Sequence, residues 1–415
     1  MNLKERLYIG VGTGLFLALL TMTIFHKQPP FWDEVYYLEN VGLLKKLGLT
    51  NEFLANYMGP AGPTFAVMHY LFSPLTDLGA PLVRLVNVFF LALTMYLTYL
   101  TLGKLQGKKS AINSLSTLAI PTVHVVSGLV LTEIFASFFL SVSIYLIISA
   151  YLKNENNYLT SIATGISLSL AILARQPLLL VILSFPFIFI STKENKYSID
   201  LTKKEFLKFL GVATISSLVL PTWAFSVWGN IQPTSQAWTG LGFSINNLIL
   251  AFGYAFLNII LVNPNYFDLK KDFSNKIELV VLILISVLLN LTIFKITDAP
   301  FGRIISTILP YVSAIYPIIC GCLLTTLGFT FFYYYLKKQL SAKNSLDIFF
   351  AIAFILVLAS CFKVTHQFST RYVVQAFPLL VLSANLNNKK ITARSIISLL
   401  IGGILGLVCL ERFFI

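Results

Sequence analysis

Two neighbouring carboxylates, Asp33 and Glu34, follow the first long apolar run of the chain, in the stretch FWDEVYYLEN. Acids stand out here because only 11% of the residues are charged. Since carboxylates can accept protons as general bases, the pair predicts chemistry at a membrane surface. The alternative is a helix start, where capping and the helix dipole favour acids. Consecutive helical residues point about 100° apart, so we expect one carboxylate to face the site and the other to support it.

Glu133 is another acid whose position suggests chemistry, because it stands in an apolar stretch, SGLVLTEIFASFF. An acid in an apolar helix is costly in a membrane and usually faces a protein interior or an aqueous cavity. The alternative is a surface glutamate at the membrane interface. The sequence leaves both positions open for Glu133.

A set of basic residues is expected to approach the same face as the acids from several helices. Converging cations suit a phosphate group, which Arg can bind through two parallel hydrogen bonds. For each of these residues the alternative is snorkelling, in which a long charged side chain reaches lipid phosphates in general. The set comprises Arg84, Arg175, Arg303, Lys363, His366 and Arg371.

The composition predicts the setting of these residues. Hydrophobic residues make up 57% of the chain, and the mean hydropathy is +0.81. Apolar runs of about 18 residues recur, and a helix of that length crosses a bilayer core of about 30 Å. We therefore expect an all-α polytopic membrane protein. The net charge of +13 comes from lysines in short loops between apolar runs, which indicates membrane topology and not nucleic-acid binding.

Several common catalytic and cofactor-binding patterns are absent. The four cysteines lie in apolar stretches, so we interpret them as small apolar residues, neither disulfides nor metal ligands. Metal-ligand spacings, nucleotide-binding glycine loops and Ser-His-Asp signatures do not occur. We therefore expect no metal and no cofactor. A reaction on the outer face would use a donor that is already activated and anchored in the lipid.

Basic residues at the ends of the apolar runs predict the topology, since positive charge marks the cytoplasmic side. Lys4 and Arg6 put the N-terminus inside, so the run 7–25 is the first membrane helix and 26–80 is the first outer loop. That loop is expected to contain short amphipathic helices along the interface, around a turn rich in Gly and Pro.

Two later apolar stretches are each expected to cross the membrane twice. Residues 110–152 have lysines at both ends and must turn in the middle. Residues 158–191 would be about 50 Å long as one helix, which is too long for one span, and Pro177 in ARQPL breaks them. Further spans are predicted at 209–227, 246–263, 277–294, 311–335, 346–362, 372–387 and 393–410.

The predicted total is about 13 helices, with the N-terminus inside and the C-terminus outside. Residues 1–415 form a single integral membrane domain in this interpretation. All four tryptophans fall on the outer face, where indole rings favour the lipid–water boundary.

At these residues the chain resembles the GT-C class of membrane glycosyltransferases, which use polyprenyl- or dolichyl-phosphate sugars. The family pattern has an acidic pair in the first outer loop, here Asp33 and Glu34. It also has a hairpin of the form G-x-x-L-x-L-A-x-L-x-R-x-P, here GISLSLAILARQP, and a late Arg-Tyr run, here TRYVVQAFPLL. The likeness covers residues 29–190, with 82–190 the most family-like helices and 209–415 the remaining ones.

Locally the chain looks most like the dolichyl-phosphate-glucose α-1,2-glucosyltransferases that finish the lipid-linked oligosaccharide. The stretches that carry this likeness include WDEVYYLENV, PLVRLVNVFF and LARQPLLLVI. Those glucosyltransferases have an Asp-Asn-Arg-His-Tyr stretch where this chain has HQFSTRY. The sugar and the acceptor therefore stay open.

The resemblance implies a GT-C-type bundle and an inverting transfer of a sugar from a polyprenyl-phosphate donor to a hydroxyl of a glycan, a lipid-linked glycan or a protein. Asp33, supported by Glu34, would take the proton of that hydroxyl. The donor phosphate would bind among Arg175, His366 and Arg371, and the site would lie on the outer or lumenal face of a plasma or endoplasmic reticulum membrane. Further candidates for the substrate site are Lys363, Arg303, Glu133 and Arg84.

A transporter or flippase of a lipid-linked saccharide is the alternative function. Such a carrier also has outer cations and about a dozen helices, but it is expected to carry charges or broken helices near the membrane midplane in pseudo-symmetric halves. Here the polar residues gather at one face, which favours the enzyme. A purely structural membrane subunit leaves the clustering of acids and cations unexplained.

Overall fold

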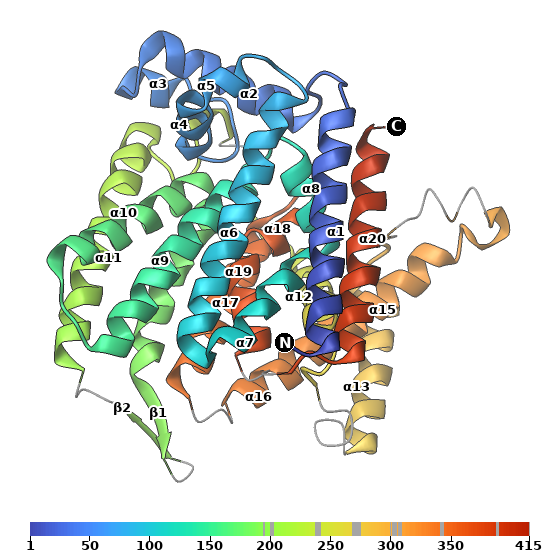
Figure 1. The fold of residues 1–415 in the computed structure, drawn as a ribbon. Helices are drawn as coiled ribbons and strands as arrows, with labels where there is room; N and C mark the ends of the chain where they lie inside the picture. The colour runs from blue at the N-terminus through green and yellow to red at the C-terminus, as the bar shows by residue number, and fades with distance from the viewer. Residues whose placement is uncertain are drawn as a thin grey trace.

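The described part of the chain is a helical bundle with one small hairpin (Figure 1). The hairpin joins β1 (Ile190–Lys193) to β2 (Lys196–Ile199), antiparallel, with Ile190 opposite Ile199. The expected all-α polytopic architecture is confirmed apart from this hairpin. The computed structural model describes all residues except 194–195, 200–202, 237–241, 268–274, 299, 301–304, 306–308, 341–343, 387–389 and 415.

Among the described residues, nine helices are long and apolar enough to cross a membrane. The predicted count of about 13 is therefore not confirmed, because the other expected passes fall on shorter helices. The nine are α1 (Leu3–Phe25), α6 (Leu82–Gln106), α9 (Glu133–Lys153), α11 (Lys204–Trp228), α12 (Ile245–Val262), α13 with its π-helical end (Lys276–Phe294), α15 with its continuation (Tyr316–Gln339), α17 with its 3-10 end (Ser345–Lys363) and α20 (Ala393–Phe414).

Both stretches expected to turn in mid-course are interrupted, the first between α8 (Pro121–Gly128) and α9 and the second at a proline. The helix α10 ends at Ala174, Arg175 is extended with φ −150° and ψ 105°, and the 3-10 helix η2 begins at Gln176. Proline at position 177 cannot donate a backbone hydrogen bond, which ends the helix as predicted. The other shorter helices are α7 (Lys108–Ala111), η1 (Ile112–Ala119), α8 (Pro121–Gly128), α10 (Tyr158–Ala174), η2 (Gln176–Phe189), η3 (Thr234–Gln236), η5 (Pro310–Val312), α18 (Arg371–Val374) and α19 (Phe377–Asn385).

The first loop contains short helices, as the sequence predicts, and they cover one end of the bundle (Figure 1). Asparagine 40 on the first of them donates to the carbonyl of Tyr36, while its oxygen accepts from the backbone N–H of Met58, which ties the Gly-Pro turn to that helix. The loop is thus a built part of the fold. Its helices are α2 (Asp33–Leu47), α3 (Asn51–Ala55), α4 (Thr64–Leu71) and α5 (Ser73–Thr76).

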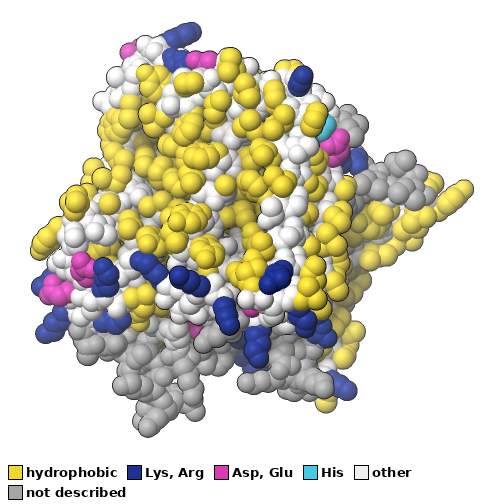
Figure 2. Space-filling view, viewed as in Figure 1, with side chains coloured by type: hydrophobic (Ala, Val, Ile, Leu, Met, Phe, Trp, Pro, Cys, Tyr) yellow, Lys and Arg dark blue, Asp and Glu magenta, His cyan; other side chains and the backbone are white. Residues whose placement is uncertain are grey.

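The two ends of the bundle differ in character. Figure 2 shows a broad hydrophobic band across the middle and most of the visible Lys and Arg side chains below it, at the end opposite α2–α5. Trp223 donates to the side chain of Asn51 at 2.8 Å and Trp228 to the carbonyl of Leu54 at 2.7 Å, so both lie at the α2–α5 end. Trp238 lies outside the described residues. This distribution suits the predicted orientation, which stays a prediction.

The last helix, α20, packs closely against the middle of the bundle through glycines. A Cβ atom at Gly402 would lie 1.9 Å from the carbonyl oxygen of Ala119, and one at Gly406 would lie 2.3 Å from the ring of His124. In a membrane the hydrophobic effect does not drive helices together, so close packing has to do so. Small residues such as glycine allow the backbones to approach that closely. The packing fixes α20 beside α1 (Figure 1), which brings its last turn to the α2–α5 end.

Candidate active site

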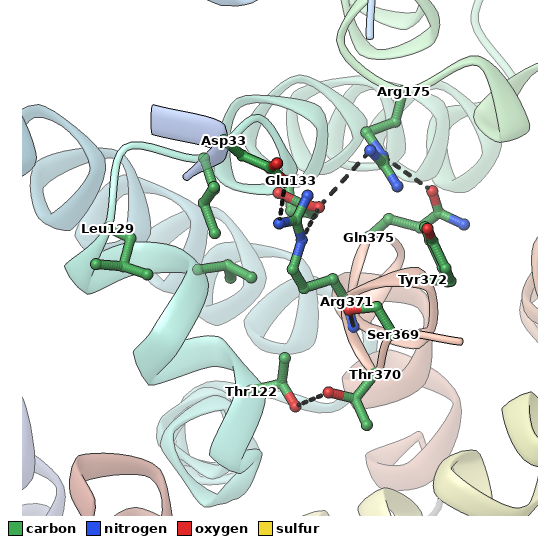
Figure 3. Close-up of polar contacts among 12 residues, drawn as sticks. Asp33, Thr122, Leu129, Glu133, Arg175, Ser369, Thr370, Arg371, Tyr372 and Gln375 are labelled. Carbon is green, nitrogen blue, oxygen red and sulfur yellow. Dashed lines mark hydrogen bonds and ion pairs between the residues drawn. The ribbon is translucent and has the colours of Figure 1, made fainter. Parts of the chain in front are cut away.

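Asp33 and Arg371 form an ion pair between the first loop and the late Arg-Tyr run (Figure 3). The Nη1 group of Arg371 donates to Oδ2 of Asp33 at 2.6 Å. Asp33 is the first residue of α2, and the N-cap position before it belongs to Trp32, which makes no side-chain capping bond. The Asp33 side chain is 45% exposed. Asp33 is therefore a carboxylate that a substrate can reach, and it does not occupy the capping position of its helix.

Glu133 lies on the other side of Arg371 and is fully buried. Its Oε1 accepts from Nε of Arg371 at 3.0 Å and lies 3.7 Å from Nη1 of Arg175. Its Oε2 has no hydrogen-bond partner among the described residues. Glu133 also begins α9, where the helix dipole favours an acid. Because it is buried between two guanidinium groups, Glu133 holds the cations in position, and the interior alternative is the one that the structure adopts.

Arg175 reaches the same cluster from the break between α10 and η2. Its Nε donates to Oε1 of Gln375 at 3.3 Å, and its guanidinium lies 5.7 Å from the centre of the Tyr372 ring. The hydroxyl group of Tyr372 in turn lies 2.7 Å from Nε2 of the exposed His366. Arg175 and Arg371 both contact Oε1 of Glu133. His366 contacts neither carboxylate and is linked to Arg175 by Tyr372.

Asp33, Glu133, Arg175 and Arg371 together carry two negative and two positive charges (Figure 3). They come from four segments far apart in the sequence, and every charge in the cluster has an opposite neighbour. A cluster balanced in this way tolerates burial better than single charges. Asp33 and Arg371 keep part of their side chains exposed, whereas Arg175 and Glu133 are buried.

Tyr37, Tyr372 and Gln375 belong to this site although the sequence did not single them out. Tyr37 lies one helical turn after Asp33, is fully buried, and its hydroxyl has no hydrogen-bond partner among the described residues. Burial raises the pKa of Tyr37 to about 12, against the opposing effect of the Arg371 guanidinium, so the phenol is neutral. The signal in the sequence was the spacing of four residues between Asp33 and Tyr37, and between Arg371 and Gln375.

Glu34 and Arg84 form a second, separate ion pair inside the fold. Arg84 is 0% and Glu34 1% exposed. The Nε and Nη2 groups of Arg84 donate to the two carboxylate oxygens at 2.9 and 2.7 Å. Glu34 also accepts from the backbone N–H groups of Val130 and Phe31, at 2.8 and 3.2 Å. The oxygens of Glu34 are therefore occupied by protein donors.

The remaining donors of Arg84 are occupied as well. They bind the backbone carbonyls of His26, Gln28 and Pro29 at 3.3, 3.0 and 3.5 Å, so that all five N–H groups have protein acceptors. Arg84 does not snorkel to the surface. It closes the loop before α2 over the end of α6.

Two other expected cations lie elsewhere. The Nζ group of Lys363 lies 4.4 Å from the centre of the Phe243 ring and is not part of the cluster of Asp33, Glu133, Arg175 and Arg371. Arg303 lies outside the described residues. Asn247 donates to the carbonyls of Val364 and His366 at 2.7 and 3.0 Å and so positions the loop that leads to Arg371.

The described residues contain no group of three or more His, Cys, Asp and Glu side chains that could hold a metal ion. All four cysteines are free thiols. The chemistry that the cluster itself offers is proton acceptance by an accessible carboxylate beside two cations that can bind an anion.

A comparison with protein-family models finds a match over part of the chain. The model of the dolichyl-phosphate-mannose-protein mannosyltransferase family matches residues 73–234, which is less than half of the chain. That segment includes Arg84, Glu133 and Arg175 and ends before Arg371. No significant match to a curated protein is found. The finer resemblance to α-1,2-glucosyltransferases is not supported by any match and stays a prediction.

Among solved structures, the chain is similar to ArnT from Cupriavidus metallidurans in a crystal structure with undecaprenyl phosphate bound. The sequence identity is 13% and the TM-score is 0.49, over 96% of this chain and 62% of that chain. This chain therefore spans less than two thirds of the length of ArnT. A similarity at this level does not establish a shared activity.

Proposed function

We propose that the chain is an inverting membrane glycosyltransferase of the GT-C class, which moves a sugar from a polyprenyl-phosphate donor to a hydroxyl acceptor. The observation that carries the proposal is the ion pair of Asp33 with Arg371, in which an accessible carboxylate lies beside a cluster of two arginines. The match of residues 73–234 to a family described by a dolichyl-phosphate-mannose donor supports a lipid-phosphate sugar. The proposal includes a single membrane domain with its site at the α2–α5 end, on the outer or lumenal face.

The reaction needs one bond formed and one broken at the anomeric carbon. The acceptor oxygen attacks that carbon from the side opposite the phosphate, and the carbon–oxygen bond to the phosphate breaks with its electron pair. Asp33 takes the proton of the acceptor hydroxyl, and the lipid phosphate leaves as an anion, so the configuration inverts. General-base help of this kind contributes about 10²–10⁴-fold to the rate.

Arg371 has two roles in this mechanism. In this structure it neutralises Asp33 through Nη1 and Glu133 through Nε. A donor phosphate competes with Asp33 for the exposed edge of the guanidinium, while the buried Glu133 keeps the other edge in place. Donor binding therefore releases Asp33 to act as the base. Arg175, the exposed His366 and the partly buried Tyr372 provide further donors to the departing phosphate.

Glu34 and Arg84 support the site in this proposal and do not contact substrate, because their donors and acceptors are occupied within the protein. The expected division between one working and one supporting carboxylate thus assigns the base to Asp33. The roles of Lys363 and Arg303 as donor-site cations stay predictions.

A direct test uses the purified full chain in detergent or lipid vesicles with polyprenyl-phosphate mannose and polyprenyl-phosphate glucose. Release of free polyprenyl phosphate, together with sugar appearing on a glycan, lipid-linked glycan or peptide acceptor, is the expected result. Loss of both in Asp33→Asn identifies the site. Movement of the intact donor across a vesicle membrane, with no release of sugar in the presence of these acceptors, would overturn the proposal and favour a carrier.

A further inference from the structure

The last turn of α20 lies against the segment that leads from α1 into Asp33, although nearly the whole chain separates them. Nε2 of His26 lies 2.7 Å from Oε2 of Glu411, and the side-chain amide of Gln28 donates to the carbonyl of Phe414 at 2.8 Å. The rings of His26 and Phe414 stack with centroids 4.2 Å apart and planes 16° from parallel. The two segments are thus joined by two side-chain hydrogen bonds and one ring contact.

Phe414 also reaches inward to the buried Arg84. Its side chain is part of the core, at 6% exposure. The guanidinium of Arg84 lies near two rings that contact each other, 5.0 Å from the centroid of Phe414 and 5.5 Å from that of Phe31. A desolvated guanidinium over an aromatic face is stabilised by the ring quadrupole, and the ring also excludes water from the ion pair. Phe414 therefore covers the Arg84–Glu34 pair from the side of α20.

The Arg84–Glu34 pair in turn fixes the backbone before both acids of the candidate active site. Glu34 follows Asp33 directly and accepts from the N–H of Phe31, two residues before Asp33. It also accepts from the N–H of Val130, three residues before Glu133. A shift of Arg84 is therefore passed to the start of α2 and to the start of α9, where the two carboxylates that bind Arg371 are located.

We infer that Phe414 is a positioning residue of the transferase, which holds Asp33 and Glu133 in register with Arg371 by way of Arg84 and Glu34. The inference rests on the proposed function. Phe414 touches neither Asp33 nor Arg371 in this arrangement and acts only through the ion pair. The end of α20 thus has a role in the reaction, although it lies outside the first loop and outside the residues that match the mannosyltransferase family.

The neighbouring residue provides a matched control. Phe413 is the same residue type on the same helical turn, but its side chain is 44% exposed and does not stack on His26 or Arg84. Phe413→Ala and Phe414→Ala therefore remove equal volume from α20, one from its outer side and one from the side that covers Arg84. Phe414→Tyr keeps the ring over the guanidinium.

The experiment measures kcat and KM for a polyprenyl-phosphate sugar on the full chain. Phe414→Ala is expected to lower kcat by about 10-fold or more with KM for the donor within about twofold, because a small misplacement of the base costs rate without removing the phosphate ligands. Phe413→Ala should match the unchanged protein, and Phe414→Tyr should recover most of the lost kcat. A Phe414→Ala protein with the kcat of Phe413→Ala would overturn the inference.

Hydrogen exchange gives a second readout that needs no activity. The backbone N–H groups of Glu34 and Val35, which donate to the carbonyls of Phe31 and Trp32, should exchange faster in Phe414→Ala than in Phe413→Ala. Equal exchange in the two variants contradicts the inference. If Phe414→Ala does not fold, Glu411→Gln is measured instead, with a smaller change in the same direction expected. An unmodified chain that turns over no donor defeats the proposed function, while the exchange result still decides the positioning role.

Discussion

The guanidinium of Arg371 lies 2.6 Å from the carboxylate of Asp33, so a cation expected to bind the donor phosphate and an acid expected to act as base are paired with each other. The pair is partly exposed, with side-chain exposures of 20% for Arg371 and 45% for Asp33. A donor phosphate can therefore approach Arg371 from the exposed side of Asp33 and compete with that carboxylate for the guanidinium.

Replacement of Asp33 by Asn separates the base from a structural carboxylate. Asn keeps the size and much of the hydrogen bonding but accepts no proton, so transfer should fall by roughly 10²-fold or more. The thermal unfolding midpoint should change little, because Asp33 is half exposed and is not the capping residue. The affinity for donor should stay the same or rise, because Asn competes less than Asp with phosphate for Arg371. Turnover and binding of polyprenyl-phosphate sugar decide this. Near-normal turnover would require a base other than Asp33.

Glu34→Gln should behave in the opposite way and lower stability more than chemistry. It leaves Arg84 buried with no counter-charge, and removing one partner of a buried ion pair costs about 3–5 kcal/mol. We expect a lower unfolding temperature and less folded protein, with the folded fraction retaining more activity than Asp33→Asn. Activity per folded molecule is the measurement. A stable Glu34→Gln protein that is as inactive as Asp33→Asn would show that Glu34 takes part in the chemistry.

Arg371→Ala and Arg175→Ala should each weaken donor binding. A desolvated phosphate loses a charge-assisted hydrogen bond worth about 1.5–3 kcal/mol, which corresponds to about 10- to 100-fold in affinity. Titration with undecaprenyl phosphate measures the phosphate contribution without the sugar. Arg371→Lys is the control for charge alone and should recover part of the loss. Unchanged affinity in both alanine variants removes these arginines from the donor site.

Tyr37→Phe tests a buried hydroxyl that has no hydrogen-bond partner among the described residues. An unsatisfied buried hydroxyl costs about 1–3 kcal/mol, so its removal should leave the unfolding temperature unchanged or raise it. The ring contact with Phe65, whose centroid lies 5.2 Å away, is kept. Thermal unfolding of the variant beside the unchanged protein is the test. A clear loss of stability would mean that the hydroxyl has a partner in the folded protein.

Labelling of single cysteines tests the orientation in the membrane. Cysteines introduced at Asn51 and Gln236 should react with an impermeant reagent added from outside the cell or in the lumen, because the basic end of the bundle (Figure 2) is expected to face the cytoplasm. Asn51 contacts Trp223 at the α2–α5 end, so its accessibility reports on that end. Labelling from the cytoplasmic side alone would show that the predicted orientation is wrong.

The sequence by itself determined that the protein is an α-helical membrane protein and where one of its helices is interrupted. Long apolar runs require membrane helices because backbone groups in lipid must be satisfied within the helix. The break at ARQPL followed from the missing N–H of Pro177, and the structure ends α10 at Ala174 as expected. These features depend on short stretches of chain and on the thickness of a bilayer, so residue type and spacing are enough to predict them.

Only the tertiary structure decided which charged groups meet. Adjacent acids at the start of α2 point in different directions, but the sequence does not say which one faces inward; packing buries Glu34 against Arg84 and leaves Asp33 half exposed. Packing also buries Glu133 fully between Arg371 and Arg175. The sequence could not predict this, because a helix that is apolar on all sides does not show which of its faces points inward. Such contacts depend on helix rotation and on segments hundreds of residues apart, which local patterns do not encode.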